Sequence, residues 1–218
     1  MRLNAFIALA TGWSRRVADQ AIIQHRVEVN GIPAHLGQQV TTSDMVRVDG
    51  NIIHIPKVHT TILLNKPVGY VCSRRGQGSL TIYSLLPARF QELKPVGRLD
   101  KDSSGLLLLT NDGALAQQLT HPSFQKEKRY HIRLNKPLQP HHKRQITEHS
   151  VLLEDGPSRF QLQPLKNQAN WRVIIKEGRN RQIRRTFQCL GYKVITLHRT
   201  DFANYHIGNI PIGSYRLL

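Results

Sequence analysis

The sequence predicts an α+β fold with a small N-terminal part and a larger second part. The chain has 218 residues, which suits one domain of good size plus a small one. Strand-like and helix-like runs are mixed along its length, and we find no internal repeat. The positive charge is uneven. Residues 1–55 carry five arginines against four acidic residues, whereas residues 56–218 carry 26 basic and 10 acidic residues.

Periodic patterns define the elements of the small part. Apolar residues recur at helical spacing near the N-terminus: Leu3, Phe6, Ile7 and Leu9. Gly12 can end this helix, and Ser14 is a suitable N-cap for a second one. "RVEVNG" (26–31) and "MVRVDG" (45–50) alternate between apolar and polar residues and then reach a turn pair, which predicts two strands.

The larger part contains five strand-like and four helix-like runs. We expect strands at 61–65, 105–110, 128–134, 171–176 and 193–198, and helices at 81–86, 112–119, 141–148 and 180–190. We place the boundary near residue 57, which gives domains 1–56 and 57–218. "GLLLLT" (105–110) does not alternate, so it predicts a strand that is buried on both faces. Asp100 lies in the polar loop just before this strand.

Charge and composition restrict the function. A formal charge of +17 and a pI near 10.6 favour a nucleic-acid partner over an anionic membrane. We find no apolar run of the roughly 20 residues that span a bilayer, and we do not interpret the N-terminus as a signal peptide. Cys72 and Cys189 lie far apart and form no metal motif. We therefore expect no metal, no membrane association and a cytoplasmic protein; because no nucleotide-binding loop is present either, we expect no cofactor.

The small part resembles the S4 RNA-binding domain. The similarity rests on "RLNAFI", "GWSRR", "RVEVNG" and "DMVRVDG", which follow one another in that family's order. The resemblance implies RNA contacts by five residues: Arg2, Arg15, Arg16, Arg26 and Asn30. A phosphate at the start of the second helix would gain both from arginine charge and from free N–H groups. The alternative is that these arginines are ordinary surface charges.

Four stretches of the larger part resemble the RsuA-like branch of ribosomal RNA pseudouridine synthases. They are "LLNKPVGYVCS" (63–73), "GRLDKDSSGLLLLTNDG" (97–113), "KRYHIRL" (128–134) and "EGRNRQIRRTFQCLGYKVITLHR" (177–199). This family breaks the bond between base and ribose in a uridine, turns the uracil, and rejoins it through carbon 5. The resemblance implies an α+β catalytic domain with a mainly antiparallel sheet and no cofactor.

The resemblance also assigns a catalytic set. Asp100 corresponds to the family's catalytic carboxylate, which acts as nucleophile or base and must be ionised to do either. Arg184 corresponds to its partner cation, with a head group free to reach Asp100. Tyr130 corresponds to the tyrosine that stacks on the target base, and Leu197 to an apolar residue of the pocket.

Further basic residues are candidates for RNA contacts. We assign Arg179, Arg181 and Arg185 to phosphate binding, because five basic residues fall within the ten from 176 to 185. Arg98 would hold the surroundings of the extracted nucleotide. Lys66 would either contact RNA or support the loop that carries Asp100.

Two other readings remain open at this point. The chain could be a non-catalytic ribosome- or RNA-binding protein that uses the S4 domain, or a DNA-binding protein, which is disfavoured because no helix-turn-helix or zinc-finger pattern is present. For the enzyme reading, the partner is ribosomal RNA or a pre-ribosomal particle and the protein is expected to be a monomer. "RQIRR" and "DKDSSG" slightly favour a large-subunit target.

Overall fold

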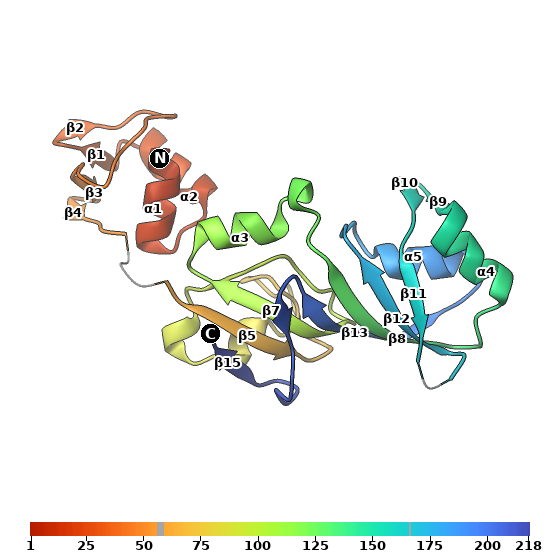
Figure 1. Ribbon diagram of the computed structural model, residues 1–218. Coiled ribbons are helices and arrows are strands. Elements are labelled where there is room, and N and C mark those ends of the chain that lie inside the picture. Colours follow the sequence, from red (N-terminus) through yellow and green to blue (C-terminus); the bar gives the residue numbers. More distant parts are fainter. Residues whose placement is uncertain (56–58, 166) are drawn as a thin grey trace. The chain divides into compact units, whose positions relative to one another are not determined.

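A computed structural model describes residues 1–55, 59–165 and 167–218 (Figure 1). The chain divides into two compact units. The first comprises Met1–Thr61, Glu92–Lys94 and Thr110–Gly113; the second comprises Ile62–Gln91, Pro95–Leu109 and Ala114–Leu218. The expected boundary between residues 56 and 57 lies outside the described residues.

The first unit consists of two helices and a small antiparallel sheet. The helices are α1 (Leu3–Thr11) and α2 (Arg15–Ile23). The sheet has the order β2-β1-β3-β4, with bounds Ile32–Pro33, Val27–Val29, Val46–Val48 and Asn51–Ile52. Gly12 ends α1 in the left-handed conformation, and the Ser14 hydroxyl accepts a hydrogen bond from the Val17 amide. Both caps and both strand-and-turn predictions are confirmed.

The second unit contains a nine-stranded sheet, which is mainly antiparallel. Seven strands follow the order β11-β12-β8-β13-β7-β5-β15, while β14 pairs with β13 and β6 pairs with β7. Their bounds are β5 Thr61–Lys66, β6 Lys94–Pro95, β7 Ser104–Thr110, β8 Lys128–Leu134, β11 Gln161–Pro164, β12 Asn170–Ile175, β13 Val194–Phe202, β14 Tyr205–His206 and β15 Tyr215–Leu217. The α+β fold class is confirmed.

The helices of the second unit are short. They are α3 (Gly113–Thr120), α4 (Pro140–Arg144) and α5 (Gln182–Cys189), with 3-10 turns η1 (Ile82–Leu85), η2 (Ala88–Phe90) and η3 (Pro122–Phe124) and a π-helical turn η4 (Gln145–His149). Figure 1 shows α4 and α5 beside the end of the sheet formed by β8, β12 and β11. No helix among the described residues is long and apolar enough to cross a membrane.

Some sequence predictions needed correction. The helix expected at 180–190 starts only at Gln182, because Arg181 adopts φ +46° and cannot continue a right-handed helix. The segment 81–86 forms only a 3-10 turn. The short hairpin of β9 (Val151–Leu153) and β10 (Gly156–Ser158) was not predicted, and neither were β11, β14 and β15. Short strands of this kind carry too few residues for a periodic signal.

The strand β7 fixes the position of the loop that precedes it. Its four leucines, Leu106 to Leu109, are fully buried, as expected for a strand covered on both faces. β7 runs parallel to β13, with Ser104 opposite His198 and Gly105 opposite Arg199. A Cβ atom at Gly105 would lie 2.2 Å from the backbone oxygen of Arg199, so only glycine permits this approach.

We predict that Gly105→Ala destabilises the protein by at least about 2 kcal/mol, because it adds a clash with the Arg199 backbone to the strain of an alanine at φ +106°. Gly213→Ala is the matched control: its φ is +84°, but nothing lies within 4 Å of the added Cβ. Urea unfolding of both variants measures the difference. Equal losses would mean that the close approach contributes nothing.

A second support of the β7–β13 pair is the hydrogen bond between the Ser104 hydroxyl and His198 Nδ1, at 2.9 Å. Burial lowers the pKa of His198, and the neighbouring His131 lowers it further. The folded protein therefore prefers neutral His198, whereas the unfolded chain takes up a proton near the ordinary value of 6.5.

The free energy of unfolding should consequently decrease as the pH falls below about 6.5. Above this pH, His198 should make no pH-dependent contribution. His198→Asn keeps a hydrogen-bonding atom at the δ position but does not titrate, so its stability should depend less on pH. The control is His149→Asn, at an exposed position of the same unit. Thermal unfolding at pH 5.5 and 7.5 tests this, and parallel curves for all three proteins would contradict it.

Candidate active site

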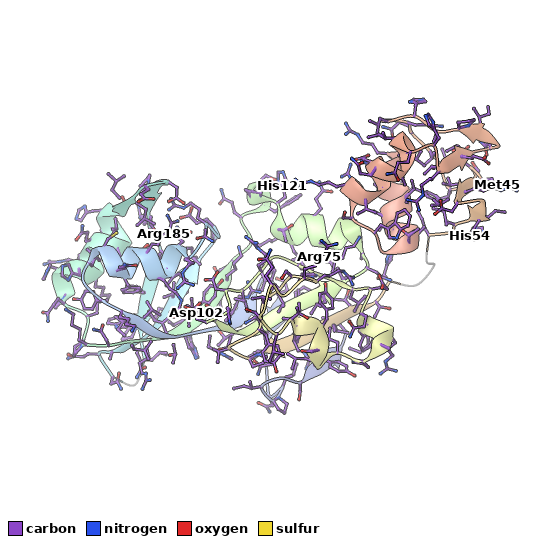
Figure 2. All side chains as sticks on the ribbon, turned by 180° about the vertical axis from the view of Figure 1, so that it is seen from behind. Met45, His54, Arg75, Asp102, His121 and Arg185 are labelled. Carbon is purple, nitrogen blue, oxygen red and sulfur yellow. The ribbon has the colours of Figure 1, made fainter. Side chains whose placement is uncertain are left out.

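The second unit contains a pocket of about 1090 Å³. Its walls come from the loop 97–103, the loop between α3 and β8, the segment from the end of β12 to the start of α5, and β13. Figure 2 labels Asp102 in the first of these loops and His121 in the second. The predicted residues that line this pocket are Arg98, Asp100, Tyr130, Arg179, Arg181 and Leu197.

Asp100 sits at the pocket wall with its carboxylate accessible. Its side chain is 32% exposed, and Oδ2 lies 3.8 Å from Arg181 Nη1. The Asp100 backbone oxygen accepts hydrogen bonds from the Ser103 amide and from the Lys66 ammonium. The backbone is therefore held from both sides, while the carboxylate remains free to meet a ligand.

Lys66 is part of the support of this loop. Its side chain is fully buried, and Nζ donates to the backbone oxygens of Pro67, Asp100 and Ser103 at 2.9, 3.1 and 2.8 Å. Burial lowers the pKa of Lys66. The prediction that Lys66 contacts RNA is corrected, because all three ammonium protons already have protein acceptors. Lys66 instead supports the loop that carries Asp100, which was the other alternative.

Two more contacts tie the same segment to the loop. The Gly69 amide donates to the Lys101 oxygen at 2.7 Å. The buried Cys72 thiol donates to the Leu99 oxygen, and the Leu99 amide in turn points at Cys72 Sγ. Burial raises the pKa of Cys72, so the thiol stays protonated and can donate. Segment 66–72 thus holds loop 97–103 at three successive places.

Two arginines near the start of α5, Arg181 and Arg184, meet a second acid of the loop, Asp102. Arg181 binds the Asp102 carboxylate with both terminal nitrogens at 2.9 Å, and this hydrogen bonding lowers the pKa of Asp102. Arg184 donates to the backbone oxygens of Asp102 and Val194, and its Nε lies 3.4 Å from the Asp102 carboxylate. The expected ion pair between Arg184 and Asp100 is therefore corrected: within the described chain, the cation paired with Asp100 is Arg181.

The left-handed conformation of Arg181 explains this arrangement. Arg181 precedes the first helical residue, so its side chain leaves the helix direction and reaches both Asp100 and Asp102. Arg184, one turn into α5, is mostly buried and clamps the loop backbone to β13. A helix starting at 180 would have placed Arg181 differently.

Arg179 and Arg185 both bind the turn between β9 and β10. Arg179 donates to the backbone oxygens of Asp155, Gly156 and Pro157, and Arg185 binds the Asp155 carboxylate at 2.8 Å. Figure 2 shows Arg185 on α5. These hydrogen bonds fix the β9–β10 turn beside α5. Phosphate binding by the two arginines stays a prediction.

Tyr130 and Leu197 form the apolar floor of the pocket. They are 8% and 7% exposed, and they come from the neighbouring strands β8 and β13. Tyr130 lies opposite Arg199 in the strand register, and Leu197 lies opposite Ile132. A flat ring and an aliphatic side chain on adjacent strands can hold a planar heterocycle.

Sequence reasoning missed two cations near this floor. Arg199 is 2% exposed and donates from Nε to the Leu106 oxygen, while its guanidinium lies 5.0 Å from the centre of the Phe202 ring. Lys128 lies over the same ring at 5.4 Å, and burial followed by repulsion from Arg199 lowers its pKa to about 8. Both residues lie in stretches that resemble the family, 128–134 and 177–199. A charged residue at a buried position of a predicted strand was the signal that could have identified them.

The predicted RNA-binding residues of the first unit differ in how many hydrogen bonds and ion pairs their side chains already make within the protein. Arg26 is bound by both arms to Asp49, and both ends of the Asn30 amide hold the turn through Asp44 and Met45. RNA binding by the exposed Asn30 stays a prediction. Arg2, Arg15 and Arg16 are exposed; Arg15 makes one long hydrogen bond to Asn4, and the structure records no ion pair of Arg2 or Arg16 with any described residue.

The chemistry of the site follows from these groups. An accessible carboxylate in the wall of a pocket can act as a nucleophile or a base when it is ionised. The apolar floor removes water from a bound ring, and surrounding cations attract an anionic ligand. Among the described residues, no group of three or more His, Cys, Asp or Glu side chains could hold a metal ion.

The contacts of Lys66 lead to a direct test. We predict that Lys66→Met lowers the free energy of unfolding by at least about 3 kcal/mol, because three carbonyl groups lose their hydrogen bond to the buried ammonium. Amide hydrogen exchange at Gly69 and Ser103 should also accelerate. Lys101→Met is the matched control: among the residues that the structure describes, this exposed lysine donates only to Ser79, so the loss should stay below about 1 kcal/mol. Equal effects of the two changes would contradict the support role.

Comparisons with known proteins agree with this geometry. The chain matches the family described as RNA pseudouridylate synthase over residues 60–189, and the S4 domain over residues 1–46. It is 36% identical to ribosomal large subunit pseudouridine synthase B of Bacillus subtilis, covering 100% of this chain and 91% of the relative. It is 34% identical to ribosomal small subunit pseudouridine synthase A of Pasteurella multocida, covering 100% and 96%.

A solved structure is similar over the same extent. The crystal structure of a pseudouridylate synthase matches with a TM-score of 0.73 and 32% identity, covering 100% of this chain and 96% of that one. Sequence and fold therefore agree along the whole length, including the segment that carries Asp100. The chain belongs to the RNA pseudouridylate synthase family, and an S4 domain precedes its catalytic segment.

Proposed function

We propose that this protein isomerises a specific uridine of ribosomal RNA to pseudouridine, with Asp100 as the catalytic carboxylate. The proposal rests on the position of Asp100, which lies in the wall of a pocket with an apolar floor and has an accessible carboxylate. The buried Lys66 ammonium holds the Asp100 backbone in place. The names of relatives that act on ribosomal RNA support the choice of substrate.

The proposed reaction needs no external reagent. The bond between ribose carbon 1′ and uracil nitrogen 1 breaks, the uracil turns, and a bond forms between carbon 1′ and carbon 5. Carbon 5 then loses its proton, and nitrogen 1 carries one in the product, so atoms balance. Asp100 assists bond breaking as a nucleophile at the ribose or as a base. Both roles need the ionised form.

Tyr130 and Leu197 would hold the uracil while it turns. The Tyr130 ring can stack on the base, which is worth roughly 1–3 kcal/mol and offsets part of the cost of extracting it. Arg184 would act through the loop, because it binds the Asp102 backbone. Arg98, exposed beside Asp100, would contact the RNA around the extracted nucleotide.

We assign RNA binding outside the pocket to the S4 domain, and propose the domains 1–56 and 57–218. Arg2, Arg15 and Arg16 are the exposed arginines available for phosphate there. The alternatives of a purely RNA-binding or DNA-binding protein leave the placement of Asp100 and Tyr130 in one pocket unexplained. A large-subunit target remains our preference on "RQIRR" and "DKDSSG", although the relatives include enzymes named for either subunit. The monomeric state and the cytoplasmic location stay predictions.

We predict that Asp100→Asn lowers pseudouridine formation by at least about a thousandfold, because the amide can act neither as nucleophile nor as base. The assay is tritium release from carbon 5 of labelled uridine in unmodified transcripts of both ribosomal RNAs. Affinity for RNA should change little, since the substitution removes no cation.

The control for this experiment is Glu154→Gln, which removes an exposed acid in the β9–β10 turn. It should keep wild-type activity. Activity in the Asp100→Asn variant would refute the mechanism. A wild-type protein that binds these transcripts but releases no tritium would instead favour the non-catalytic alternative.

A further inference from the structure

The loop between α3 and β8 exposes an aromatic ring that the core does not use. Phe124, the last residue of η3, is 50% exposed. Its neighbours His121, Pro122, Gln125 and Lys126 line the pocket that also holds Asp100. Phe124 therefore stands at the border of the pocket.

The loop is built to hold this ring in place. Pro122 starts the turn, and His121 Nδ1 accepts a hydrogen bond from the Ser123 amide at 3.3 Å. The His121 ring meets the Phe124 ring edge to face, with centroids 6.1 Å apart. Gln125 then adopts the left-handed conformation at φ +42°, which is uncommon for a residue other than glycine. An exposed ring fixed by its own loop loses little freedom when it binds a partner.

The charges around the ring indicate an anionic partner. Eight Lys and Arg side chains line the pocket, against three acidic ones. Lys126 Nζ also lies 5.8 Å from the centre of the Phe124 ring, so a cation and an aromatic face are presented together. An apolar protein partner would have to remove water from these cations without compensation. A nucleic acid base with its phosphate satisfies both groups.

We propose that Phe124 is a stacking platform for an unpaired RNA base that flanks the target uridine, and that Lys126 contacts the phosphate of that nucleotide. This proposal rests on the proposed function, because it needs RNA in the pocket. Extracting a uridine also breaks the stacking of its neighbour. A ring at the border of the pocket restores a stacking partner to that neighbour and keeps the strand open.

The experiment compares Phe124→Ala, Phe124→Leu and Phe124→Trp in the full-length protein. The matched control is Leu152→Ala, because Leu152 is 78% exposed in the same unit but does not line the pocket. We expect Phe124→Ala to raise KM for tritium release by roughly tenfold with kcat nearly unchanged, since the platform binds substrate and transition state alike. Phe124→Trp should keep the wild-type KM, and Phe124→Leu should resemble alanine.

A second readout does not depend on catalysis. Single-stranded oligouridylate should quench the added tryptophan fluorescence of Phe124→Trp beyond the change seen in the wild type, which contains Trp13 and Trp171. The affinity of Phe124→Ala for this probe should be roughly 5- to 150-fold weaker. A wild type without tritium release would overturn the proposed function, whereas quenching and the affinity loss would still support the platform.

Three outcomes would overturn the platform. The first is a Phe124→Ala variant with the KM and oligouridylate affinity of the Leu152→Ala control. The second is full activity of Phe124→Leu, which would indicate apolar packing without stacking. The third is a change of sedimentation coefficient in Phe124→Ala without a change in RNA affinity, which would assign the ring to a contact between two copies. Circular dichroism establishes that each variant is folded.

Discussion

The active site depends on the buried ammonium of Lys66. A charged group in the interior is tolerated only when hydrogen bonds replace its water, and here three backbone oxygens do so. Two of them belong to Asp100 and Ser103, at the two sides of the loop that carries the carboxylate. The same bonds that make the burial of Lys66 possible therefore determine where Asp100 stands. Gly69 and Cys72 extend this support along the loop.

Charge in this protein serves two separate purposes. The arginines of α5 are largely paired with Asp102 and Asp155, so they shape the loop and the β9–β10 turn. These paired cations add little to the attraction of RNA at a distance. That attraction comes from side chains such as Arg98 and Lys126, which line the pocket without an acid partner among the described residues. A basic helix in a sequence can thus be structural even in an RNA-modifying family.

The elements that the sequence predicted correctly are those with strong local signals. The buried strand of four leucines, the Ser14 cap and the Gly12 helix end all follow from a few neighbouring residues. The start of α5 was misplaced because the left-handed conformation of Arg181 has no local sequence signal; an arginine rarely adopts it. The short strands β9, β10, β14 and β15 were missed because each has only two or three residues, too few for a periodic signal. β15 also depends on pairing with the distant strand β5.

The sequence by itself determined the α+β class and the family, because ordered motifs and local periodicity identify them. It also predicted Asp100 as the catalytic carboxylate. Only the tertiary structure decided which cation meets which acid. Lys66 proved to be buried, Arg181 proved to face Asp100, and Arg184 proved to clamp the loop backbone. Partner choice among several arginines and aspartates depends on side-chain directions and on residues some 80 positions apart, as Asp102 and Arg181 are, and no local pattern encodes that distance.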